Sequence, residues 1–251
     1  MQPVLSILVP TYKRADKLRR ALESVPGAVS AIYEVIVIDD CPDGSGRGVA
    51  QRFGAHYVHK AGVDRGQSFS RNIGLELARG QWVVFLDDDD YFLPGGLDRL
   101  LQGAAGGSTP VVFGDYQAFT SSARTEVSLA QVSWDLLLVC NQIPMGAFVI
   151  ARQAVKRNFD TRMRSHEDWD FLLSNIATGG MAHVPVGVVA IDKTENQTTS
   201  TEARRRRFFW LDFLSIYARF PASHLAQARE AMLASLGVQL PTGLLQIDDV
   251  I

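Results

Sequence analysis

The sequence predicts an α/β fold in which a mostly parallel central sheet is flanked by helices. Short apolar runs rich in β-branched residues alternate with amphipathic stretches through the first hundred residues. Such alternation is typical of parallel strands that are buried on both faces and connected by helices. After about residue 107, strand-like and helix-like segments follow one another in a mixed order. Polar and acidic residues also gather where the predicted strands of the first half end.

The first half contains three apolar runs that are predicted as buried strands, at 4–9, 33–38 and 81–86. A shorter strand is predicted at 56–58. The segments between them have helical spacing, which predicts helices at 14–25, 46–53 and 68–78. In the last of these helices we expect an apolar face made by Ile73, Leu75, Leu77 and Ala78.

The second half is predicted to be mixed. Its strand-like segments lie at 111–119, 147–151 and 184–191, and its helical segments at 167–177, 205–219 and 224–236. The glycine-rich stretch 103–109 is predicted as a surface loop. We find no internal repeat and no linker, so the 251 residues are expected to form one domain.

Composition excludes several classes of protein. The net charge is −2, so no global basic field is available to hold nucleic acid. Cys41 and Cys140 lie far apart, which argues against a disulfide framework or a zinc site and favours buried free thiols. No apolar run approaches the roughly 20 residues that span a bilayer, and the start of the chain does not resemble a signal peptide. We therefore expect a cytoplasmic protein, with peripheral attachment to the inner face of a membrane left open.

Polar groups follow three of the predicted parallel strands. They are Pro10-Thr11-Tyr12, Asp39-Asp40 and the run from Asp87 to Asp90. Because open α/β sheets bind ligands at the carboxyl ends of their strands, these groups are expected to converge on one site.

The acidic run 87–90 is the sharpest of these signals. Four adjacent carboxylates repel one another, and a hard divalent cation with oxygen ligands, Mn²⁺ or Mg²⁺, would offset that repulsion. Asp87 and Asp89 are two positions apart, so on an extended segment their side chains would point to the same side. The alternative is a solvated acidic turn ahead of Pro94.

Four segments together resemble the family 2 glycosyltransferases, which have the nucleotide-diphospho-sugar (GT-A) fold. They are SILVPTYKR at 6–14, EVIVIDD at 34–40, GQSFSRNIGLELARGQWVVFLDDDD at 66–90 and HEDWDFLL at 166–173. The resemblance implies a single domain with a nucleotide-sugar-binding half at 1–107, an acceptor and catalytic half at 108–200, and a helical extension at 201–251.

The resemblance also implies roles for residues on the donor side. The nucleotide pocket would be lined by Pro10, Thr11, Tyr12 and Arg14, with Tyr12 packing on the base. Asp39 would accept a hydrogen bond from the base, Asp88 would lie near the ribose, and Arg71 and Asn72 would lie near the diphosphate and sugar. Asp89 would be the main metal ligand, with help from Asp87. Tyr12 and Asn72 could instead be ordinary turn and helix residues, and Arg71 could simply pair with Asp87 or Asp88.

The acidic pair Glu167-Asp168 is the second chemical centre. An inverting transfer needs a base that takes the proton of the attacking hydroxyl, and a carboxylate with a tuned pKa can serve. By resemblance the base is Asp168, while Glu167 supports it or binds the acceptor and Trp169 offers an apolar face to a sugar ring. The alternative is that the pair only stabilises a helix start through the helix dipole.

Two features depart from the family pattern or stay open. Many relatives carry a histidine near the metal, but here Thr194 stands at that position, so Glu195 or water would complete the metal shell. The run from Arg204 to Arg207 has three readings. Arg204 and Arg205 could close over a diphosphate, the run could meet an anionic membrane together with Phe208, Phe209, Trp210 and Phe213, or it could be a solvated helix start with an aromatic core face.

The sequence thus predicts an inverting, metal-dependent glycosyltransferase that uses a nucleotide-sugar donor, most commonly a UDP-sugar in this family. A glycan or lipid-linked glycan, as in surface polysaccharide synthesis, is the acceptor that the resemblance suggests, and homo-oligomerisation is left open. A sugar nucleotidyltransferase is disfavoured because Val9-Pro10-Thr11-Tyr12 lacks a glycine-rich triphosphate loop. A non-catalytic nucleotide-sugar-binding protein is the third alternative.

Overall fold

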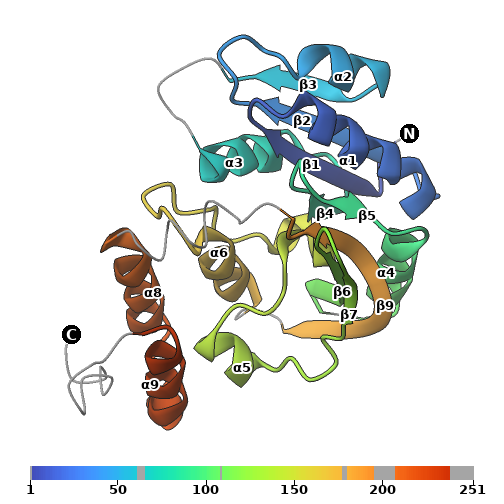
Figure 1. The fold of residues 1–251 in the computed structure, drawn as a ribbon. Coiled ribbons are helices and arrows are strands. Elements are labelled where there is room, and N and C mark those ends of the chain that lie inside the picture. The colour runs from blue at the N-terminus through green and yellow to red at the C-terminus, as the bar shows by residue number, and fades with distance from the viewer. Residues whose placement is uncertain (1, 61–65, 108, 177–179, 195–206, 238–251) are drawn as a thin grey trace.

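The computed structural model describes residues 2–60, 66–107, 109–176, 180–194 and 207–237. Within these ranges one sheet has the strand order β3-β2-β1-β4-β8-β6-β9-β5, with β7 paired to β6. Helices cover the sheet, and Figure 1 shows two further helices of the C-terminal part standing beside α6 and α5. The predicted α/β class is therefore confirmed.

The first half forms the parallel part of the sheet. Its strands are β1 (Leu5–Thr11), β2 (Tyr33–Asp39), β3 (His56–His59) and β4 (Trp82–Phe85). All neighbouring pairs among them run parallel, with Thr11 opposite Asp39 and Leu8 opposite Phe85. The polar groups that follow these strands consequently emerge at one edge of the sheet, as the sequence predicts.

Three helices join these strands, at about the positions that the sequence predicts. In α1 (Ala15–Ala28) the buried positions include Leu18, Leu22 and Val25, while α2 (Arg47–Arg52) buries Val49 and Ala50.

The third helix, α3 (Gln67–Leu77), buries the predicted apolar face only in part, since Ile73 and Leu75 are half-buried against the core and Ala78, just after the helix, is buried. Its buried side is made by Ser68, Ser70, Arg71 and Gly74, and Leu77 is exposed. The reason is close packing, because a Cβ atom at Gly74 would lie 3.1 Å from both Leu8 and Ile38. Small residues let α3 approach the sheet, and this face brings Arg71 to the carboxyl edge.

The second half extends the sheet with mixed pairing. Its strands are β5 (Tyr91–Phe92), β6 (Val111–Phe119), β7 (Arg124–Val127), β8 (Phe148–Ala151) and β9 (Met181–Asp192). β8 pairs antiparallel with β4 and β6, and β9 runs parallel to β6. The sequence did not predict α4 (Gly96–Ala105), and the expectation of a loop from residue 103 was wrong, because the last turn of α4 extends to Ala105.

The remaining helices belong to the second half of the chain. They are α5 (Trp134–Val139), α6 (Glu167–Ile176), α8 (Arg207–Arg219) and α9 (Ala226–Ser235), with short 3-10 turns at Met145–Ala147, Arg152–Ala154 and Ser223–Leu225. The buried Arg229 of α9 donates to the carbonyls of Leu138 and Phe220, which fastens α9 to the ends of α5 and α8. In the part of the chain that the structure describes, no helix combines the length and apolarity needed to cross a bilayer.

Candidate active site

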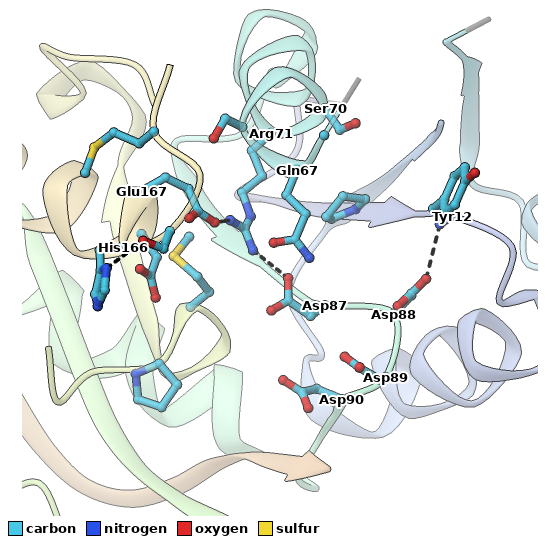
Figure 2. A pocket seen from close by; sticks show the side chains of 18 of the residues that line it. Tyr12, Gln67, Ser70, Arg71, Asp87, Asp88, Asp89, Asp90, His166 and Glu167 are labelled. Atoms are coloured by element: carbon cyan, nitrogen blue, oxygen red, sulfur yellow. Dashed lines mark hydrogen bonds and ion pairs between the residues drawn. The ribbon is translucent and has the colours of Figure 1, made fainter. Parts of the chain in front are cut away.

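A cavity of about 1300 Å³ opens at the carboxyl edge of the parallel strands. Its walls come from the ends of β1 and β4, the start of α3, the loops at 141–145 and 161–166, and the end of β9. It is lined by most of the residues that the sequence singles out, namely Pro10, Thr11, Tyr12, Arg14, Arg71, Asp87, Asp88, Asp89, Glu167 and Asp168. Figure 2 shows the acidic run on one side of this space and Glu167 on the other.

Asp88 is held by the residues that follow β1. Its carboxylate accepts hydrogen bonds from the Thr11 hydroxyl at 2.7 Å and from the Tyr12 backbone N–H at 3.4 Å, and it pairs with Arg14 at 3.2 Å. Burial raises the pKa of Asp88 to about 6, although the Thr11 hydrogen bond and the Arg14 charge act in the opposite direction. Asp88 thus fixes the β1 end against the acidic run and leaves Tyr12 half exposed at the cavity wall.

Asp87 and Asp89 are the more accessible members of the run, with side chains 28% and 27% exposed. Each has one guanidinium partner, Arg71 for Asp87 and Arg14 for Asp89, both at 2.8 Å. Burial and the neighbouring charge of Asp87 raise the pKa of Asp89. Among the described residues, no three His, Cys, Asp or Glu side chains are arranged to enclose a metal ion.

Asp90, which had no predicted task, ties the acidic run to the end of β9. Its carboxylate accepts the backbone N–H of Asp192 at 3.0 Å. Arg20 of α1 donates to the carboxylate of Asp192 at 3.0 Å and to the backbone carbonyl of Asp89. Thr194, the residue at the expected histidine position, donates its backbone N–H to the Asp192 carboxylate at 2.9 Å and so stabilises the chain just after β9.

A single buried guanidinium connects the two acidic centres. Arg71 is 2% exposed and pairs with Asp87 at 2.8 Å and with Glu167 at 2.9 Å (Figure 2). Burial raises the pKa values of both Glu167 and Asp168, and Arg71 opposes that rise. The Asp168 carboxylate also accepts hydrogen bonds from the Asn141 side chain at 3.1 Å and from the Trp169 N–H at 2.8 Å. Since α6 begins at Glu167, the acidic pair lies in its first turn, where the helix dipole favours negative charge.

Two residues predicted on the donor side do not line the cavity. Asp39 is fully buried, and its carboxylate accepts the backbone N–H groups of Cys41 and Gly46 and the hydroxyl of Tyr57. Asn72 exchanges two hydrogen bonds with the backbone of Phe159. The polar atoms of both side chains are engaged in holding the fold, and Asp40, not Asp39, faces the cavity.

Trp169 was predicted to stack on a sugar, and the structure shows otherwise. The indole is fully buried, donates its N–H to the Leu137 carbonyl at 2.7 Å, and packs its ring against Phe213 and Tyr217 of α8. Trp169 therefore fastens α8 and α5 to α6, and its buried ring has no face free for a ligand.

We expect Trp169→Ala to lower the free energy of unfolding by about 3–5 kcal/mol, because it removes a large buried ring and leaves a cavity. Trp169→Phe keeps most of the packing and is expected to cost less. Urea unfolding of the two variants measures both costs. A cost below about 1 kcal/mol for the alanine variant would contradict the buried position.

Two of the aromatic residues that follow the arginine run pack inside the protein. Phe209 and Phe213 are buried and lie against the ring of His166, as the core-face interpretation predicts. Arg204 and Arg205, and likewise Glu195, lie outside the described residues. The ring nitrogen Nε2 of His183 lies 2.8 Å from the Asp115 carboxylate.

The loops at 141–145 and 161–166, which complete the cavity, were not predicted from the sequence. Asn141, Met163 and His166 line it, and His166 has a positive backbone φ of 57°. The one available signal was position, because His166 directly precedes the acidic pair. Asn141 carried no signal, since it reaches Asp168 across 27 positions of the chain.

Comparison with known proteins identifies the family of this chain. The family model described as Glycosyl transferase family 2 matches residues 6–163, more than half of the chain. An uncharacterized glycosyltransferase of Haemophilus influenzae is 30% identical over 184 residues, which are 68% of this chain and 61% of the relative. The succinoglycan biosynthesis protein ExoO of Rhizobium meliloti is 25% identical over 243 residues, 82% of this chain and 69% of ExoO. The chain thus spans about three fifths of the Haemophilus relative's length.

Solved structures with low identity share the fold. S. aureus TarS in complex with UDP-GlcNAc has a TM-score of 0.68 at 16% identity, covering 94% of this chain and 80% of that one. The mannosyltransferase PcManGT from Pyrobaculum calidifontis, in complex with GDP-Man and Mn²⁺, has a TM-score of 0.68 at 17% identity, covering 95% and 71%. The chain belongs to glycosyl transferase family 2 and has the GT-A fold.

Proposed function

We propose that this chain transfers a sugar from a nucleotide-diphospho-sugar to a hydroxyl group, with inversion at the anomeric carbon. The observation that carries the proposal is the placement of two acidic centres, 87–90 and 167–168, on one cavity with a single guanidinium between them. A donor complex and an attacking hydroxyl must meet at such a place. The family membership and the nucleotide-sugar complexes of the structural neighbours agree with it.

The donor side suits a charged nucleotide. Thr11, Tyr12 and Arg14 line the wall above Asp88, where the half-exposed Tyr12 ring can pack on a base. UDP is our first choice of nucleotide because it is the commonest in the family.

Asp89 and Asp87 fit a divalent cation. Their partly exposed carboxylates supply hard oxygen ligands. Burial, and next the charge of Asp87, raises the pKa of Asp89, so a cation beside it would stabilise its ionised form. When bound, Mn²⁺ or Mg²⁺ would neutralise the departing diphosphate, and diphosphate oxygens and water would complete its shell.

Asp168 is the proposed general base. Its raised pKa brings it closer to neutral pH, where a base is most effective. The carboxylate is oriented at both oxygens, because Oδ2 accepts from the Asn141 side chain and Oδ1 accepts from the Trp169 N–H. The acceptor hydroxyl gives its proton to Asp168 as its oxygen forms a bond to the anomeric carbon. The bond from that carbon to the diphosphate oxygen breaks, and its electron pair leaves with the nucleoside diphosphate. Attack opposite to the leaving group inverts the anomeric configuration.

The acceptor is proposed to be a glycan or lipid-linked glycan of a surface polysaccharide, in keeping with the similarity to the succinoglycan biosynthesis protein ExoO. We propose a cytoplasmic site of action at or near the inner face of the membrane.

A thermal-shift screen tests the donor and cation assignments together. UDP, GDP, dTDP and CDP are each added with and without Mn²⁺. A nucleoside diphosphate at about 100 times its Kd is expected to stabilise the chain by about 2.7 kcal/mol, roughly 5–10 °C in Tm for a protein of this size. The rise should require Mn²⁺ and should disappear in Asp89→Asn. Asp16→Asn is the control, because Asp16 is exposed on α1. A screen in which no nucleotide raises Tm contradicts the proposed function.

A further inference from the structure

We infer that His166 selects the acceptor: its unprotonated Nε2 atom accepts a hydrogen bond from a hydroxyl of the acceptor sugar beside Asp168. This inference rests on the proposed function, since it names a specificity residue for the same cavity. It starts from a chain of hydrogen bonds that fixes where the protons lie.

Asp212 of α8 anchors the chain of hydrogen bonds. One of its carboxylate oxygens, Oδ2, accepts the backbone N–H groups of Arg164 at 2.9 Å and Ser165 at 3.0 Å, and it lies 3.2 Å from the Ser165 hydroxyl oxygen. A carboxylate only accepts, so the Ser165 hydroxyl must direct its proton to Asp212.

The position of that proton determines the tautomer of His166. Its Nδ1 atom lies 2.9 Å from the Ser165 hydroxyl oxygen. Because the serine proton is already committed to Asp212, the serine oxygen can only accept here, and Nδ1 must carry the hydrogen. In a neutral imidazole the lone pair then resides on Nε2.

The surroundings of the ring keep it neutral. Phe209, Phe213 and Trp169 enclose it, with ring centroids 4.5, 5.0 and 6.0 Å away. Burial lowers the pKa of His166 to about 4, against the weaker opposing effect of Glu167 and Asp212. A charged ring would turn Nε2 into a donor, and the enclosure disfavours that state.

Nε2 is left available to a ligand. Among the described residues none forms a hydrogen bond with this atom, which is nevertheless not fully buried. Because His166 lines the cavity, we take Nε2 to be accessible from it. The backbone of His166 is held at a φ of 57°, a left-handed conformation that residues other than glycine adopt rarely. The Asp212 to Ser165 contacts hold this strained turn in place and thereby orient the ring.

The chemistry of a lone pair at this position restricts what can bind. Phosphate oxygens are acceptors at neutral pH and gain nothing from it, whereas a sugar hydroxyl can donate to it. Both donor and acceptor carry hydroxyls, but His166 belongs to the turn that leads into Glu167 and Asp168, on the α6 side of the cavity (Figure 2). We therefore assign the hydroxyl to the acceptor.

Nitrogen NMR of the imidazole rings tests the tautomer and the ligand. The protein is labelled with ¹⁵N at its five histidines, and His166→Asn identifies the His166 signals. Asparagine tolerates a positive φ, so this variant is expected to keep the turn. We expect a protonated Nδ1 and a bare Nε2 at pH 7. With UDP and the diamagnetic Mg²⁺ present, the Nε2 signal should move upfield with at least one of the methyl glycosides of glucose, galactose, mannose and N-acetylglucosamine, and should not move with UDP-glucose alone.

Kinetics with the glycoside that moves the signal provides the second readout. His166→Asn should raise the acceptor KM about tenfold more than the donor KM, the effect of losing one hydrogen bond. Ser165→Ala should act in the same direction, because it frees the ring to adopt the other tautomer. His56→Asn, at an exposed position on β3, is the control that should change neither KM.

Three results would overturn the inference: a protonated Nε2, no response to any glycoside, or a response to the donor sugar alone. These outcomes are separate from failure of the proposed function. Transfer by an enzyme whose Nε2 signal ignores every glycoside refutes only the role of His166, while absence of nucleotide binding in the thermal screen refutes the proposed function.

Discussion

Asp168→Asn is expected to lower kcat by about 10²–10⁴, the usual contribution of a general base. Asparagine has nearly the same shape and can still accept the hydrogen bond from the Trp169 N–H, so the fold should be retained. The amide cannot take the proton of the attacking hydroxyl. Initial rates with the donor found in the nucleotide screen measure the loss, and Tm verifies the fold.

Glu167→Gln is the matched comparison for the base assignment. The Glu167 carboxylate is committed to Arg71 at 2.9 Å, whereas Asp168 is oriented only by an amide and a backbone N–H. We therefore expect a much smaller fall in kcat for Glu167→Gln. Near-normal turnover of Asp168→Asn, or a larger loss in Glu167→Gln, would show that the base is not Asp168.

The raised pKa of Asp168 predicts two further results, one for the pH dependence of the parent enzyme and one for the stability of Asp168→Asn. A base must be ionised to act, so kcat/KM should rise with pH through an acid limb that lies above the ordinary range of aspartate. The folded state holds this proton more tightly than the unfolded state, so ionisation at neutral pH costs stability. Asp168→Asn removes that cost and is expected to be no less stable than the parent at pH 7.

The sequence could predict those parts of the fold that depend on local pattern. The runs that became β1, β2 and β4 are apolar on both faces, and the polar residues after them lie at the predicted edge. The position of Asp87, Asp88 and Asp89 follows from β4 alone, because the acidic run begins just beyond its end.

The parts that could not be predicted depend on contacts between distant segments. Trp169 follows an acidic pair, but its partners Phe213 and Tyr217 come from α8, which no local pattern places against α6. Asn72 faces the backbone of Phe159, 87 positions away. Asp39 stands at the expected strand end, but its carboxylate accepts the hydroxyl of Tyr57 from β3, 18 positions away. In each case the side chain is of a type that could bind a ligand, but it is engaged in a tertiary contact instead.

Arg71→Met is expected to lower the free energy of unfolding by about 3 kcal/mol, the lower end of the range for breaking a buried ion pair. The guanidinium is 2% exposed, and its removal leaves the carboxylates of Glu167 and Asp87 without the cation that they share. The lower end applies because these two carboxylates keep some contact with solvent, at 17% and 28% exposure. For a chain of this size the loss corresponds to roughly 6–12 °C in Tm.

A double variant separates loss of charge from loss of packing. If the cost of Arg71→Met comes from the stranded carboxylate, adding Glu167→Gln should recover part of it, and urea unfolding of the two single variants and the double variant gives the coupling free energy. Arg71→Lys retains the charge but not the two-pronged geometry, so it should hold one carboxylate and release the other. Additive losses in the double variant would mean that Arg71 stabilises α3 through packing alone. A coupling of about 1 kcal/mol or more would mean that the Arg71 guanidinium fixes the positions of Asp87 and Glu167 relative to each other. A substitution at either acidic centre would then alter the geometry of the other.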